Sequence, residues 1–401
     1  MNSRVRPRGQ TTMNVRVLPW LSVQPSVADV VRDVRSGAVE QEDVWLSAYV
    51  AAPERVSEHG SVRVARGAPV SSRSAALDVT CIEGPRWTVA VHGRIQVPPT
   101  VVHVPCVRGV LPVAHATTMD LTAPAAGTRR WCLGGADGAL RAGVWGPCEQ
   151  PQSPFTAAVD LPGHGSDITS ATFFPSGEVV LSTSLDMRAR VFSAIDGTCP
   201  RVLEGHTRAV LCSAMLGRGR EVLTGGADDS VRLWDVGRGA SVRVLSVGGA
   251  VRQLQICDSG LLGGIGACVP CWDLRVGNDA AVKTWTMPAS PLGGRERAVE
   301  ALAVRGHGLL VGTSDGMCAH YDLRADAPLT SWCRNTAGVT DMVWEDGAAV
   351  VATADGLPYR MTLGTLDVEE LAGWDTERVC ALRHDGTHVV AAGAEAWAVY
   401  S

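Results

Sequence analysis

The chain has 401 residues, of which 46% are hydrophobic, and a formal net charge of −5 at pH 7. This apolar content is ample for a large core and excludes a chain that is disordered throughout. The mild negative charge gives no reason to expect nucleic acid or an anionic membrane as the main partner. Since no uninterrupted run of about 18 apolar residues occurs, we also expect no membrane-spanning segment.

The twelve cysteines lack the spacing of a disulfide framework. Several, such as Cys212 and Cys380, lie within apolar runs, where a free thiol packs as a small hydrophobic group. No hydrophobic secretory segment is visible. The sequence therefore predicts a protein of a reducing compartment, cytoplasmic or nuclear.

The first 28 residues contain four arginines and no acidic residue. The arginines are Arg4, Arg6, Arg8 and Arg16. Two interpretations stay open, a disordered extension and an organelle-targeting segment. We expect the disordered extension, because Pro7, Pro19 and Pro25 would break an amphipathic helix.

Residues 1–100 contain one helical pattern and several strand patterns. Val27, Val30 and Val34 recur at helical spacing and predict a helix over Val27–Arg35. Strand patterns follow at Val44–Val50, Ser61–Ala65, Leu77–Ile82 and Trp87–Val91. We therefore expect residues 1–100 to form a small N-terminal domain, beginning with the arginine-containing extension.

Beyond residue 100 the chain repeats itself. Gly163-His164 opens one segment and Gly205-His206 opens a second, 42 residues further on, which closes with Trp234-Asp235. The other matching landmarks are Ser182 with Thr224, Asp186 with Asp228, and Phe192 with Trp234. A Gly-His opening, a Trp-Asp close and a period of about 40 residues are typical of a WD repeat, which forms one four-stranded blade of a β-propeller.

Weaker copies occur at the same spacing on both sides of this pair. The blade cores begin near His115, His164, His206, Val251, Val299, Val339 and Val379. The sequence therefore predicts an all-β protein, with a seven-bladed WD-repeat β-propeller over residues 101–401. The last copy has only three strands, so we expect Val101–Val107 to supply its fourth and close the ring. Ala289–Arg297, which interrupts the entry into the fifth blade, is expected to be a surface loop.

The strongest repeat contains a His, a hydroxyl and an acid, which also recur together in hydrolase active sites. The residues are His206, Thr224, Asp228 and Trp234. In a WD blade these positions form a buried structural network, in which the acid holds the His, the His holds the hydroxyl and the hydroxyl meets the indole N–H. We favour the structural interpretation. The preceding repeat has His164, Ser182 and Asp186, but Phe192 offers no N–H, so its network should lack one bond.

Two further motifs are weak matches to catalytic or metal sites. Residues Gly312–Gly316 match G-x-S-x-G, but a nucleophile elbow needs a strand-to-helix turn and this turn should join two strands. Cys268 and Cys271 form a C-x-x-C without the helix of a redox pair or the second pair of a zinc site. We therefore expect no catalytic residue, no metal, no cofactor and no enzymatic activity.

Partner binding is expected at the loops of one face of the propeller, around its central axis. Residues just before the innermost strands should ring that opening, and the residue after Asp228 should be exposed with them. These candidates are Asp167, Arg208, Asp229, Arg297, Glu377 and Arg378. As a ring of mixed charge they could specify a protein partner.

The stretch from Gly163 to Leu245 resembles the proteasomal ATPase-associated factor family. The resemblance is carried by Phe173–Ser182, Met187, Phe192–Ala194, Gly217–Val222 and Val231–Arg238, with Trp45–Ser47 also similar. It implies an N-terminal domain, a seven-bladed propeller and a chaperone of 26S regulatory-particle assembly that binds the C-terminal domain of a base ATPase subunit. The matched residues are mostly structural, so no contact residue is carried over.

A second function stays open, because a propeller fold serves many roles. The chain could instead be a constitutive scaffold or receptor subunit of another complex, such as a ubiquitin ligase or an RNA-processing assembly. In either case we expect a protein partner, neither nucleic acid nor membrane, and a monomer when the protein is free.

Overall fold

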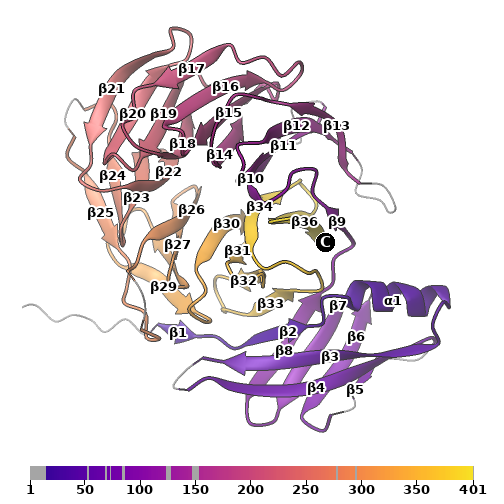
Figure 1. The fold of residues 1–401 in the computed structure, drawn as a ribbon. Helices are drawn as coiled ribbons and strands as arrows, with labels where there is room; N and C mark the ends of the chain where they lie inside the picture. Colours follow the sequence, from indigo (N-terminus) through magenta and orange to yellow (C-terminus); the bar gives the residue numbers. More distant parts are fainter. Residues whose placement is uncertain are drawn as a thin grey trace, which may run out of the picture.

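The computed structural model describes residues 15–51, 54–67, 70–72, 74–83, 86–122, 128–146, 153–276, 279–293 and 296–400. Among these residues the elements are almost all strands, with one helix, α1 (Val27–Ser36). Figure 1 shows a ring of sheets with a layer of N-terminal strands against one side. The arginine-containing start at residues 1–14 lies outside the described residues.

The ring is a seven-bladed WD-repeat β-propeller, and each blade begins with its innermost strand (Figure 1). Blade 1 contains β10 (Ala116–Leu121), β11 (Arg130–Gly135), β12 (Leu140–Trp145) and β13 (Phe155–Asp160). Blade 2 contains β14 (Ile168–Phe173), β15 (Val179–Ser184), β16 (Arg188–Ser193) and β17 (Arg201–Glu204). Blade 3 contains β18 (Val210–Leu216), β19 (Glu221–Gly226), β20 (Ser230–Asp235) and β21 (Ala240–Ser246).

The remaining blades follow in chain order. Blade 4 contains β22 (Val251–Cys257), β23 (Gly260–Ile265), β24 (Cys268–Trp272) and β25 (Lys283–Thr286). Blade 5 contains β26 (Val299–Arg305), β27 (Gly308–Thr313), β28 (Met317–Asp322) and β29 (Pro328–Cys333). Blade 6 contains β30 (Val339–Glu345), β31 (Ala348–Thr353), β32 (Tyr359–Thr362) and β33 (Val368–Leu371). Blade 7 contains β34 (Val379–His384), β35 (Val389–Gly393), β36 (Ala396–Tyr400) and β9 (Val107–Val110).

Every innermost strand has a β-bulge after its first residue, where the register with the second strand shifts. The extra residues are Thr117, Thr169, Leu211, Arg252, Glu300, Thr340 and Cys380. Bulges redirect side chains at the end of a strand. Four of these residues donate to a carbonyl of the next innermost strand: the hydroxyls of Thr117, Thr169 and Thr340 at 2.6–2.7 Å, and the thiol of Cys380 at 2.9 Å.

The ring is closed by β9, which pairs antiparallel with β36. The sequence-based prediction placed this closing strand at Val101–Val107 and was wrong in position. Residues 101–103 instead belong to β8 (Gln96–His103), which pairs in parallel with β33 of blade 6. Valine-rich stretches lie on both sides of Pro105, so the local pattern does not distinguish the two strands.

The N-terminal part consists of two sheets and the helix α1. One sheet contains β2 (Trp20–Val23), β3 (Gln41–Val50), β4 (Val56–Ala65) and β5 (Ser71–Ser72). The other contains β6 (Leu77–Glu83), β7 (Arg86–His92) and β8, and it continues blade 6 into a seven-stranded sheet. Both sheets and α1 share one core, which includes Val30, Val44 and Trp87.

The chain before this core also runs along the propeller. A short strand, β1 (Arg16–Val17), pairs in parallel with β29, and Leu18 N–H donates to the Cys333 carbonyl at 2.9 Å. The outer strands of blades 5 and 6 are therefore both paired with N-terminal strands. This pairing protects two sheet edges and fixes the N-terminal part beside blades 5 and 6.

Candidate functional site

The His206 network is complete in the structure. His206 Nδ1 lies 3.0 Å from both carboxylate oxygens of Asp228, and its Nε2 lies 2.7 Å from Thr224 Oγ1. The indole N–H of Trp234 donates to the same hydroxyl oxygen at 2.8 Å. Because a carboxylate only accepts, the His206 proton sits on Nδ1, and Nε2 accepts from the Thr224 hydroxyl.

The corresponding network in blade 2 lacks one bond. His164 contacts Asp186 at 2.9 Å and Ser182 at 2.8 Å, but Phe192 takes the place of the indole donor. Both histidine side chains are buried, with 0% of His164 and 1% of His206 exposed. These side chains bond to one another and are closed to solvent, so the arrangement holds turns together and offers no group to a substrate.

Burial sets the protonation of this network. Burial lowers the pKa of His206 below its ordinary value of 6.5, and the neighbouring Asp228 only partly opposes the change. Burial alone would raise the pKa of Asp228, but donors from Thr207 N–H, the Ser230 hydroxyl and His206 outweigh it and lower the pKa. His206 is therefore neutral and faces an ionised Asp228, to which it donates its Nδ1 proton.

The weaker motifs also lie in structural surroundings. Gly312–Gly316 joins β27 to β28, two strands, and its Asp315 accepts from Thr313 and Arg297. Cys268 and Cys271 both lie on β24; the first contacts Thr286 and the second Ser259. Across the described residues there is no group of three His, Cys, Asp or Glu side chains able to hold a metal ion.

The six partner-binding candidates lie in two groups. Asp167, Arg208 and Asp229 belong to the loops of blades 2 and 3. Arg208 and Asp229 are exposed, and Asp167 is half-buried. Asp229 has a positive φ of 58°, a conformation that a non-glycine residue rarely adopts.

The second group lies at the loops that enter blades 5 and 7. Glu377 and Arg378 are exposed, as expected for contact residues. Arg297 is different, because it is bound within the molecule: its guanidinium donates to Asp315 at 2.8 Å and to the Pro288 carbonyl at 2.8 Å. We therefore leave Arg297 out of the contact set and assign it the role of holding the Asp315 turn.

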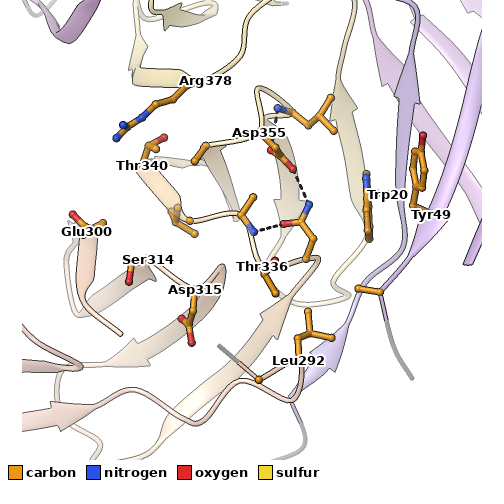
Figure 2. Close-up of a pocket in the computed structure, with 18 of the residues that line it drawn as sticks. Trp20, Tyr49, Leu292, Glu300, Ser314, Asp315, Thr336, Thr340, Asp355 and Arg378 are labelled. Carbon is orange, nitrogen blue, oxygen red and sulfur yellow. Dashed lines mark hydrogen bonds between the residues drawn. The ribbon is translucent and has the colours of Figure 1, made fainter. Parts of the chain in front are cut away.

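A pocket of about 1480 Å³ lies on this loop face, between blades 4–7 and the N-terminal sheet (Figure 2). Its floor comes from the loops around Ser314, Thr336 and Asp355, and its inner end from the bulge residues Arg252, Glu300 and Thr340. Arg378 is the one partner-binding candidate that lines it. The described chain thus has a concave site, whereas the sequence analysis expected only a ring of charged loop residues.

The outer wall of this pocket comes from the N-terminal part. Trp20 on β2 and Tyr49 on β3 stack with ring centroids 5.3 Å apart, and the Arg55 guanidinium lies 5.5 Å from the Tyr49 ring centre. All three line the pocket. Sequence reasoning missed them, because it gave the N-terminal part no position relative to the propeller.

No helix in the described part of the chain is long and apolar enough to cross a membrane. Nine of the cysteines whose side chains the structure describes, Cys132 and Cys212 among them, are free thiols.

Residues 156–193 and 197–235 match the family described as WD domain, G-beta repeat. Similar proteins include human THO complex subunit 6, 30% identical over 30% of this chain and 36% of its own length. The zebrafish (Danio rerio) eukaryotic translation initiation factor 3 subunit I is 36% identical over 25% of this chain and 31% of its own length. The 26S proteasome regulatory subunit RPN14 of Saccharomyces cerevisiae is 47% identical over 14% of each chain.

The chain therefore spans well under half the length of each of these relatives. Each matched repeat runs from the outer strand of one blade through the three inner strands of the next, β13–β16 and β17–β20, and each contains one of the two histidine networks. The chain therefore contains WD repeats, and its fold is a seven-bladed WD-repeat β-propeller.

Proposed function

We propose that this protein is a non-catalytic assembly chaperone that binds the C-terminal domain of a proteasomal base ATPase subunit while the 26S regulatory particle assembles. The observation that carries the proposal is its 47% identity with the proteasome regulatory subunit RPN14 over 57 residues. WD-repeat propellers bind protein partners through their loops, so a protein-binding role agrees with the fold. A cytoplasmic or nuclear location agrees with the free cysteines.

The contact set that we propose is Asp167, Arg208, Asp229, Glu377 and Arg378. Charged groups at an interface rim speed encounter and select the partner more than they add affinity. Such contacts suit a chaperone that must leave again. It would act by occlusion: it would cover an ATPase surface that docks on a neighbouring subunit or on the proteolytic core, until the complete ring competes for that surface.

The test of this role is the quantity of the protein in successive assembly states. Native particles are separated by size, and the molar ratio of this protein to the base ATPases is measured in each fraction. We expect a one-to-one complex with an ATPase subunit in early fractions and no protein in the mature 26S particle. Stoichiometric recovery in the mature particle would exclude the chaperone role.

A second function, a constitutive scaffold subunit of another complex, is favoured by a specific observation. The matches to THO complex subunit 6 and initiation factor 3 subunit I cover 30% and 25% of the chain, more than the 14% matched by RPN14. A ubiquitin-ligase receptor or a subunit of an RNA-processing assembly belongs to this class. Recovery in fixed stoichiometry with such a complex, and without proteasomal ATPases, would establish this second function.

A further inference from the structure

The pocket between the loop face and the N-terminal sheet extends from the propeller axis outward to β2 and β3. Its inner end contains Arg252, Glu300 and Arg378, and its outer end contains Trp20 and Arg55. Figure 2 shows Arg378 and the Trp20–Tyr49 pair on opposite sides, with Thr336 and Asp355 between them. At about 1480 Å³ the pocket exceeds the range of roughly 300–1,000 Å³ typical of small-molecule sites. Its size therefore suits an extended peptide segment.

The acidic side chains of the pocket are already engaged within the molecule. Asp315 accepts from Arg297 at 2.8 Å and from the Thr313 hydroxyl at 2.5 Å. Asp355 accepts from the Asn335 amide at 2.7 Å, and Glu300 accepts from Arg252 at 2.9 Å. Arginine partners offset the charges of Asp315 and Glu300, whereas the Asn335 amide is neutral and leaves Asp355 its negative charge.

Two arginines of the pocket have no such partner. Arg378 is exposed, and among the described residues its guanidinium has no ion-pair partner within 4 Å, although its positive charge partly offsets the rise that burial gives the pKa of Glu300. Arg55 is exposed too, and its contact within the described chain is with the face of Tyr49, which leaves its charge uncompensated. Each end of the pocket therefore has one positive charge in excess, from Arg55 at the outer end and from Arg252 and Arg378 against Glu300 at the inner end, although the chain as a whole carries −5.

We propose that this pocket binds an extended acidic segment of a protein partner, whose carboxylates pair with Arg55 and Arg378 and whose apolar side chains pack at the Trp20–Tyr49 wall. Guanidinium groups pair well with carboxylates because their planar N–H forks match the two oxygens. Aromatic rings at one end supply the apolar contact that anchors such peptides. Nucleic acid is disfavoured, because two arginines without carboxylate partners are fewer than the several phosphate contacts on which nucleic-acid binding rests.

Binding of an acidic segment in this pocket does not require that the partner be a proteasomal ATPase subunit. A native-particle experiment that excludes the chaperone role would leave the peptide site untouched. Conversely, a pocket that binds no acidic peptide would leave the contacts of blades 2 and 3 available to the proposed ATPase partner.

The test is direct binding of a defined probe to the full-length protein. A short fluorescein-labelled peptide of alternating Glu and Leu is titrated by fluorescence anisotropy, beside the same peptide with Gln in place of Glu. The variants Arg55→Gln and Arg378→Gln each remove one charge from the pocket. Arg238→Gln is the matched control, because Arg238 is 83% exposed on blade 3, outside the pocket.

We expect the Glu peptide to bind and the Gln peptide to bind at least about tenfold more weakly, since each bond to a charged group contributes roughly that factor. Arg55→Gln and Arg378→Gln should each weaken binding by about tenfold, whereas Arg238→Gln should change it less than about twofold. The proposal is overturned if both peptides bind equally, or if the control variant loses as much affinity as the pocket variants. Tighter binding of a single-stranded oligonucleotide than of the Glu peptide would also overturn it.

Discussion

At the scale of single residues, one hydrogen-bond donor distinguishes the two matched repeats. Blade 3 has Trp234, whose indole N–H donates to Thr224, whereas blade 2 has Phe192 near His164 and no such donor. The polar groups of the network are buried in both blades. A group that loses one hydrogen bond there therefore has only the other members of the network to bond with. The repeats thus provide a natural comparison of the network with and without the indole.

The variant Trp234→Phe should convert the blade 3 network into the blade 2 form. We expect a loss of about 1–3 kcal/mol in the free energy of unfolding, from one lost hydrogen bond and some lost packing.

The variant Asp228→Ala should lower the free energy of unfolding by a few kcal/mol, because it leaves His206, Ser230 and the Thr207 N–H without their acceptor. Chemical denaturation measures both values. Unchanged stability in either variant would contradict the structural role of the network.

The buried histidines should make stability depend on pH. Burial lowers the pKa of both His164 and His206 below 6.5 in the folded protein. The unfolded chain therefore binds protons that the folded chain does not, so the free energy of unfolding should fall as the pH drops below 6.5 towards the folded pKa.

The control for this prediction is His206→Gln, which removes one of the two titrating groups. We expect the variant to be less stable at neutral pH but to lose stability less steeply between about pH 7 and pH 5 than the wild type. Thermal melts across this range provide the comparison. Equal slopes for the two proteins would show that His206 does not titrate on unfolding.

At the scale of elements, a buried ion pair joins three segments that are distant in the chain. Arg334, just after β29, donates to both carboxylate oxygens of Glu370 on β33 at 2.7 and 2.8 Å. The Leu21 N–H of β2 donates to the same carboxylate at 3.0 Å, and Arg334 lies 4.3 Å from the ring centre of Tyr359. Only 4% of Arg334 and 3% of Glu370 are exposed, so this pair fixes blades 5 and 6 and the N-terminal sheet together without contact with water.

Removing one member of the Arg334–Glu370 pair should destabilise the folded protein. We expect Glu370→Ala to reduce the free energy of unfolding by about 3–5 kcal/mol, because it leaves a buried guanidinium charge without its partner. The double replacement Arg334→Met with Glu370→Leu should cost less than either single loss of a partner, since it leaves no buried charge. A double-mutant cycle by chemical denaturation checks both values. Additive losses would contradict the coupling.

The elements were predictable where the pattern is local. The helix over Val27–Arg35 and the strand order of the blades follow from periodicity and from the repeat itself, and the structure has α1 and seven four-stranded blades there. The strands β8 and β9 were not separable, because both are valine-rich and differ only in their partners, β33 and β36. Register with a distant strand is not encoded in a single segment.

At the scale of the whole molecule, the N-terminal part changes the form of the loop face. Strands β1 and β8 pair with the outer strands of blades 5 and 6 (Figure 1). With this placement Trp20, Tyr49 and Arg55 line one pocket together with the propeller loops. Sequence reasoning could place candidate charges in the loops, because the position of each loop follows from the blade period, but it could not foresee that Arg297 binds Asp315 within the molecule. It could not predict the pocket, which depends on parallel pairing between strands that are more than 200 residues apart in the chain. The loop face therefore has two unlike regions, an open charged one on blades 2 and 3 and a concave one on blades 4–7.

The measurement that tests the central claim most directly is affinity capture with quantified stoichiometry, comparing the wild type with the double charge swap Arg208→Glu/Asp229→Arg. Both residues are exposed on blade 3, and Arg238→Glu serves as an exposed control outside the proposed contact set. We predict recovery of one proteasomal base ATPase subunit with its assembly intermediates, reduced at least about tenfold by the double swap and unchanged in the control. Recovery of the ATPase unaffected by the swap would keep the function and reject the site, whereas recovery of an unrelated stable complex without the ATPase would contradict the account.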